Sequence, residues 1–149
     1  MTAPALPAAF ELVVPHRLPM RLVDTLLSHE GARTVAEAGP REMHLFAEKD
    51  GRLHAAALLE MMAQTYAAAI GYQMTLEGKP VRDGYLVAVN EFTAHADAFK
   101  TDRLTIETTS TGTVDAFSMA DAVVKRGEEV VATGGLRVFS LPPKNPETK

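Results

Sequence analysis

Apolar residues dominate one stretch near the middle of the chain, residues 55–74. It consists mainly of alanine, leucine and methionine, which favour helices, and no proline interrupts it. Asp50-Gly51 precedes the stretch and Gly78-Lys79-Pro80 follows it, as is typical of helix boundaries. The pattern predicts a helix of roughly two dozen residues, about 35 Å long. Because it is apolar on nearly every side, it must be covered on nearly every side.

This stretch approaches the about 20 residues that cross a bilayer. However, Glu60, Gln64 and Gln73 lie inside it, and a carboxylate in a lone membrane span would cost several kcal/mol. We therefore interpret it as a helix buried in protein and expect no membrane partner.

Strand patterns lie on both sides of the helix. Before it, residues 20–28 and 33–38 flank a turn and predict a hairpin. After it, the segments rich in β-formers are residues 85–92, 103–111, 114–125 and 129–139. We expect the first of these to be buried, Gly112 to separate the second from the third, and the last to be an exposed edge at Gly134-Gly135.

These elements predict an α+β fold in which a curved antiparallel sheet wraps around one long central helix. The chain has 149 residues, 46% of them hydrophobic, which fits a single domain over residues 1–149. We expect its core at about residues 10–140 and a flexible, proline-rich tail at 141–149.

Charge and residue counts narrow the chemistry. With 15 basic and 19 acidic residues, the net charge of −4 argues against nucleic-acid binding. The absence of cysteine excludes disulfides, thiolate metal sites and cysteine nucleophiles. The five histidines lack metal-ligand spacing, so we expect no metal site. The first residues resemble no secretory signal, so we expect a cytoplasmic protein.

Two motifs carry a resemblance to a known family. The segment Val14-Pro15-His16-Arg17-Leu18-Pro19-Met20-Arg21-Leu22-Val23-Asp24 resembles the "PHRxPxxLVD" opening of the β-hydroxyacyl-[acyl carrier protein] dehydratases. Glu60-Met61-Met62-Ala63-Gln64 resembles their "ExxAQ" motif on the central helix. The order of the motifs and the later strands are also similar, over roughly residues 12–140.

The resemblance implies a hot-dog fold and a hydro-lyase without a cofactor. Its substrate would be a 3-hydroxyacyl thioester on acyl carrier protein or coenzyme A, converted to the enoyl thioester in fatty-acid or specialised polyene or polyketide synthesis. The aryl-polyene subgroup is one such branch. The family also implies a homodimer or a hot-dog heterodimer with active sites at the subunit interface.

Dehydration needs a base for the α-proton, an acid for the departing hydroxyl and donors for the thioester oxygen. Glu60 is the only charged side chain between His54 and Glu77, and we expect it to be catalytic. The alternative is a buried ion pair between Glu60 and an arginine, Arg17 or Arg137. Gln64 lies one helical turn further on the same face, where it would bind substrate or tie helix to sheet.

The histidine that the family uses is missing from its usual place. The resemblance sets it in a "GHFPxxPxxPG" segment fourteen residues before the glutamate. Phe46 stands there, and we expect it to contact substrate. Ala55 takes the place of the glycine whose backbone N–H binds the thioester oxygen. His44 is a substitute if the segment is two residues longer than usual. Another substitute is His54. It lies about 9 Å from Glu60 along the helix axis, so the two cannot meet on one helix, but His54 can reach the Glu60 of a second subunit across an interface.

Several alternatives stay open at this stage. The site has His54, His44 or no catalytic histidine, and His16 is structural or lines the pocket. The chain is a dehydratase, a hot-dog thioesterase, or a non-catalytic hot dog that pairs with an active homologue. For a carrier protein, which is acidic, basic residues should surround the tunnel mouth. The candidates are Arg17, Arg21, Arg52, Lys79, Arg82, Lys100 and Arg103.

Overall fold

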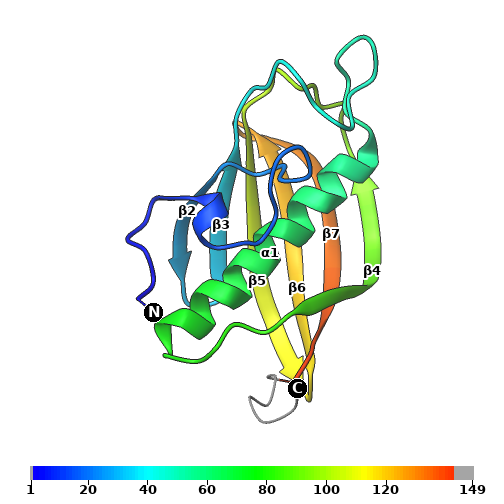
Figure 1. Ribbon diagram of the computed structural model, residues 1–149. Helices are drawn as coiled ribbons and strands as arrows, with labels where there is room; N and C mark the ends of the chain where they lie inside the picture. Colours follow the sequence, from blue (N-terminus) through cyan, green and yellow to red (C-terminus); the bar gives the residue numbers. More distant parts are fainter. Residues whose placement is uncertain (1, 143–149) are drawn as a thin grey trace.

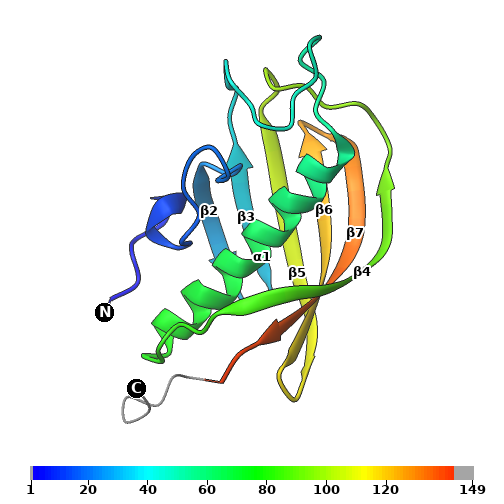
Figure 2. The ribbon, with the colours of Figure 1, turned by 45° about the vertical axis from the view of Figure 1, so that its right-hand side comes forward.

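The computed structural model describes residues 2–142, so most of the expected tail lies outside the described residues. A seven-stranded antiparallel sheet curves around one long helix (Figures 1 and 2). The elements are β1 (Ala8–Ala9), the 3-10 turn Phe10–Leu12, β2 (Thr25–Glu30), β3 (Arg33–Ala38), α1 (Ala55–Leu76), β4 (Gly84–Ala94), β5 (Leu104–Val114), β6 (Phe117–Arg126) and β7 (Glu129–Ser140).

The strands follow the order β1-β2-β3-β5-β6-β7-β4 across the sheet. β2 and β3 form the predicted hairpin, and β5, β6 and β7 form the predicted meander. Between β3 and β5 the chain passes through α1 and then β4, and β4 lies at the far edge of the sheet beside β7. This is the hot-dog fold, and it confirms the predicted α+β architecture.

The helix packs one face against the concave side of the sheet. Leu58, Met61 and Met62 of the helix are buried, as are Leu104 and Ile106 of β5. Inward-facing residues of β5 alternate with more exposed ones, as expected for a strand with one face in the core. No helix within residues 2–142 has the length and hydropathy needed to cross a membrane.

The opposite face of α1 is less covered than predicted. Ala56 and Ala67 are exposed, and Glu60, Ala63 and Ile70 are only half-buried. The expectation that the helix is covered on nearly every side is therefore wrong for a single chain, because the sheet lies on one side only.

Three strand predictions are also wrong. β2 begins at Thr25 rather than near residue 20, because the residues before it form a loop that bonds to the helix. Gly112 lies within β5 at a bulge, and the turn into β6 comes at Asp115, which has a left-handed φ of 54°. The expected exposed edge at β7 is an interior strand, because β4 pairs with it.

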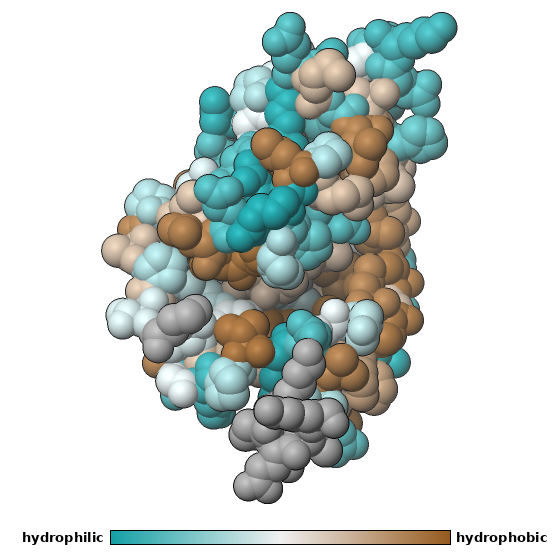
Figure 3. All heavy atoms as spheres, viewed as in Figure 1, coloured by the Kyte–Doolittle hydropathy of each residue, from teal (hydrophilic) through white to brown (hydrophobic). Residues whose placement is uncertain are grey.

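β4 is instead the exposed edge, although its sequence predicts a buried strand. Tyr85 and Val87 are 60% and 50% exposed, and Val81 just before the strand is 58% exposed. Figure 3 shows hydrophobic residues gathered along this edge, which lies on the right in Figure 1. A long apolar edge strand is a surface that soluble proteins ordinarily cover.

Candidate functional site

A cavity of about 200 Å³ lies beside Glu60 on the less covered face of α1. One wall comes from the helix, a second from the loop that carries His16, and a third from β4 and the end of β7. The lining residues are His16, Glu60, Ala63, Gln64, Ala67, Ile70, Gly71, Val81, Arg82, Gly84, Leu86, Val138 and Ser140.

Small residues make room for this cavity. Ala63, Ala67 and Gly71 follow Glu60 at intervals of three, seven and eleven residues, so they lie on the same helical face. Their short side chains leave space between the helix and β4. These three lining residues were not predicted from the sequence. The signal that could have indicated them is the recurrence of small residues at helical spacing after Glu60.

Gln64 connects Glu60 to the loop before β2. Its Oε1 accepts a hydrogen bond from the N–H of Leu22 at 2.9 Å. Its Nε2 donates to the carbonyl of Met20 at 2.7 Å and to Oε1 of Glu60 at 3.0 Å. Because Gln64 is 1% exposed, these bonds replace water completely. Gln64 was expected to connect the helix to the sheet, and its hydrogen bonds connect the helix to the loop that precedes β2.

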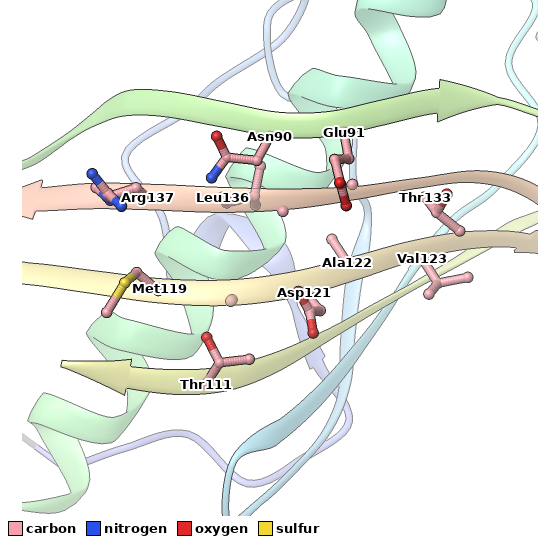
Figure 4. Close-up of a pocket in the computed structure, with 13 residues that line it drawn as sticks. Asn90, Glu91, Thr111, Met119, Asp121, Ala122, Val123, Thr133, Leu136 and Arg137 are labelled. Carbon is pink, nitrogen blue, oxygen red and sulfur yellow. The ribbon is translucent and has the colours of Figure 1, made fainter.

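The ion pair considered for Glu60 does not form. Arg17 instead donates to the backbone carbonyls of Val14 and His16, each at 2.9 Å. Arg137 points away from the helix, on the outer face of the sheet (Figure 4). Within residues 2–142 Glu60 has no salt-bridge partner, so its carboxyl faces the cavity with Gln64 as its hydrogen-bond donor.

His16 reaches the same cavity from the loop. It is half-buried, and its Nδ1 is buried without a hydrogen-bond partner among residues 2–142. An unpartnered buried nitrogen is uncommon in folded proteins. The structure therefore brings together Glu60, Gln64 and His16 of the predicted site residues.

His54 and Ala55 lie in a different hollow, at the start of α1. His54 is the residue just before the helix, its side chain is 69% exposed, and its Nε2 is 3.3 Å from Oε1 of Glu48. The hollow there, about 170 Å³, includes Ala55 but not Glu60. Within one chain, the backbone N–H of Ala55 is thus separate from the carboxyl of Glu60.

His44 and Phe46 occupy the loop before α1, again outside the Glu60 cavity. Nδ1 of His44 accepts a hydrogen bond from the N–H of Phe46 at 3.1 Å, and Nε2 is buried without a partner among residues 2–142. Burial lowers the pKa of His44, the positive charge of Arg41 lowers it further, and Asp24 opposes both.

This lowered pKa predicts a stability that depends on pH. The folded state keeps His44 neutral, while the unfolded chain takes up a proton near the ordinary value of 6.5, so acidification below that value favours unfolding. We expect the melting temperature of the wild type to fall more than that of His44→Gln between about pH 7.5 and about pH 5.5. Equal losses, measured by circular dichroism, would show that His44 does not contribute.

A further hollow, about 480 Å³, lies on the outer face of the sheet. Figure 4 shows Asn90, Glu91, Asp121 and Arg137 on neighbouring strands, with α1 behind them. All four side chains are exposed, and this surface carries no histidine. It is larger than the Glu60 cavity, but its two carboxyl groups, on Glu91 and Asp121, are exposed to solvent, whereas Glu60 is half-buried. Within residues 2–142, no three His, Asp or Glu side chains converge as a metal site.

Comparison with known families identifies the chain. The family model described as ApeP-like, ApeP dehydratase, matches residues 8–148. The chain belongs to the ApeP-like dehydratase family. This confirms the resemblance to hot-dog dehydratases of the aryl-polyene type. A search of curated proteins finds no significant match to this ApeP-like chain.

Solved structures share the fold of this ApeP-like protein. The dehydratase heterocomplex ApeI:P from Xenorhabdus doucetiae is similar with a TM-score of 0.83 and 20% identity, over 95% of this chain and 94% of that one. A hypothetical thioesterase with coenzyme A from Streptococcus pneumoniae has a TM-score of 0.63 and 13% identity, over 80% and 87% of the chains. At these identities the likeness concerns the fold alone.

Proposed function

We propose that this ApeP-like protein dehydrates 3-hydroxyacyl thioesters to enoyl thioesters, with Glu60 as a catalytic residue. The observation that carries the proposal is the environment of Glu60. Its carboxyl lines a cavity, lacks an ion-pair partner among residues 2–142 and receives a hydrogen bond from a fully buried glutamine. A carboxyl held in this way is available to give or take a proton.

We further propose that a second hot-dog subunit completes the site. A cavity of about 200 Å³ is smaller than the about 300–1,000 Å³ of typical ligand pockets. It borders β4, whose exposed apolar edge is suited to pairing with another strand. The similar fold of a dehydratase heterocomplex supports such pairing, with an identical or a different subunit.

A charge at this edge should prevent pairing. We expect the wild type to sediment as a dimer and Val87→Lys as a monomer, because Val87 is 50% exposed on the edge strand and a buried lysine without a partner is unfavourable. Analytical ultracentrifugation measures this difference, with Val114→Lys, on an exposed strand end away from β4, as the control. A wild type that stays monomeric would contradict self-pairing and favour a different hot-dog partner.

The acyl group is proposed to arrive on the phosphopantetheine arm of a carrier protein or coenzyme A. Arg82 lines the Glu60 cavity and gives its wall a positive charge. Of the other expected basic residues, Arg103 pairs with Glu37 and Arg21 pairs with Glu11, while Arg52 lines the separate hollow at the start of α1. Of the expected basic residues, Arg82 is thus the one placed at the Glu60 cavity to contact an acidic carrier.

The function is tested by incubating the protein with 3-hydroxybutyryl-pantetheine. We expect the enoyl thioester, detected by its absorbance and by mass spectrometry. Release of free thiol without an enoyl product would instead select the thioesterase alternative. Neither product, with the protein alone or in complex with a dehydratase subunit, would favour a non-catalytic hot dog.

A further inference from the structure

The cavity beside Glu60 contains its own candidate for the second proton-transfer group. The ionisable side chains that line it are Glu60, His16 and Arg82. An arginine keeps its proton in proteins and cannot act as a base. Among the residues that line this cavity within residues 2–142, His16 is thus the ionisable side chain besides Glu60 that can serve as a general acid or base.

The loop holds His16 in a defined position from both sides. Arg17, the next residue in the chain, donates to the carbonyls of Val14 and of His16 itself. Downstream, Gln64 bonds to the backbone of Met20 and Leu22. The same Gln64 donates to Glu60, so one buried amide sets the loop and the carboxyl relative to each other.

His16 and Glu60 each keep one side-chain atom without a hydrogen-bond partner within residues 2–142. Nδ1 of His16 has no partner among residues 2–142 although it is buried. On Glu60, Gln64 engages Oε1, and no other hydrogen bond to the carboxyl is formed within the described residues. A buried nitrogen without a hydrogen-bond partner is unfavourable, and a ligand in the cavity that bonds to it would remove that cost.

We propose that His16 and Glu60 of the same chain form the acid–base pair of the dehydration, which rests on the function proposed above. His16 takes the C2 proton, and the C2–H electron pair forms the C2=C3 bond. The C3–O bond breaks, and the hydroxyl leaves as water with the proton of Glu60. The proton on His16 then returns to Glu60, so no further reactant is consumed.

The other two candidate histidines do not meet these conditions within the chain. His54 is exposed and lies beside Glu48 at the start of α1. His44 lines a hollow with Arg41 and Asp24 rather than with Glu60. In this proposal the second subunit supplies walls to the site, and the two reacting side chains come from one protomer.

Kinetics of histidine variants test the pair, with 3-hydroxybutyryl-pantetheine as substrate and the pairing subunit present. We expect His16→Ala to lower kcat by about 10²–10⁴. Added imidazole should restore part of that activity, because it fits the space left by the side chain and accepts the proton. His44→Ala and His54→Ala should stay within a few-fold of the wild type.

A conservative variant separates catalysis from structure. His16→Asn keeps a polar group near the position of Nδ1 but cannot take up the proton, so it should fold as the wild type does and lose as much activity as His16→Ala. Full activity of His16→Asn, or loss of activity in His44→Ala instead, would overturn the pair while the dehydratase function stands. A wild type that forms no enoyl product would overturn both.

Discussion

Replacing Glu60 by glutamine is expected to reduce kcat for dehydration by about 10²–10⁴, because an amide can neither give nor take the proton that the carboxyl transfers. The fold should persist. Glu60 is half-buried and forms no ion pair within residues 2–142, and a glutamine still offers an oxygen to Nε2 of Gln64 at 3.0 Å. Steady-state formation of the enoyl thioester measures the effect, and thermal melting checks the fold.

Glu128→Gln is the matched control, since it makes the same change in the exposed turn between β6 and β7. Its activity should equal that of the wild type. If Glu60→Gln kept full activity, Glu60 would have no part in the reaction, and the cavity would have to serve binding alone.

Removing the amide of Gln64 is expected to have the second large effect, on stability. In Gln64→Leu the buried N–H of Leu22 loses its side-chain partner, and so does the carbonyl of Met20, at a partly buried position. Each unmet buried group costs about 1–3 kcal/mol, so we expect the free energy of unfolding to fall by about 2–4 kcal/mol. Urea denaturation followed by circular dichroism measures this loss.

Gln73→Leu provides the comparison on the same helix. Gln73 bonds to His29 and Glu77, but it is exposed, so water replaces the lost bonds. We expect its effect on unfolding to stay below about 0.5 kcal/mol. Similar losses in the two variants would mean that the loop before β2 does not depend on Gln64 for its position.

The long helix and most strands were predictable because local patterns determine them. Residues 55–74 contain helix formers without a proline, and the helix observed is Ala55–Leu76. The errors have a common cause. Whether a strand lies at an edge, or whether Gly112 forms a turn or a bulge, depends on which strand pairs beside it, and pairing partners distant in sequence leave no local pattern.

The site divides in the same way. Glu60 and Gln64 belong to a short motif on one helix, where a spacing of four residues places side chains on one face, so the sequence was sufficient to select them. His54 and His44 were chosen by their distance along the chain from Glu60. The structure places each in a separate hollow, and whether either reaches Glu60 across an interface stays a prediction.

His16 shows what sequence patterns leave undecided. Forty-four positions separate it from Glu60, and the two line one cavity because Gln64 bonds the intervening loop to the helix. Periodicity and motif therefore specified the helix, the strands and the carboxyl on the helix, since these depend on near neighbours. The exposed edge of β4 and the histidine that shares the cavity were decided by tertiary contacts between segments far apart in the chain.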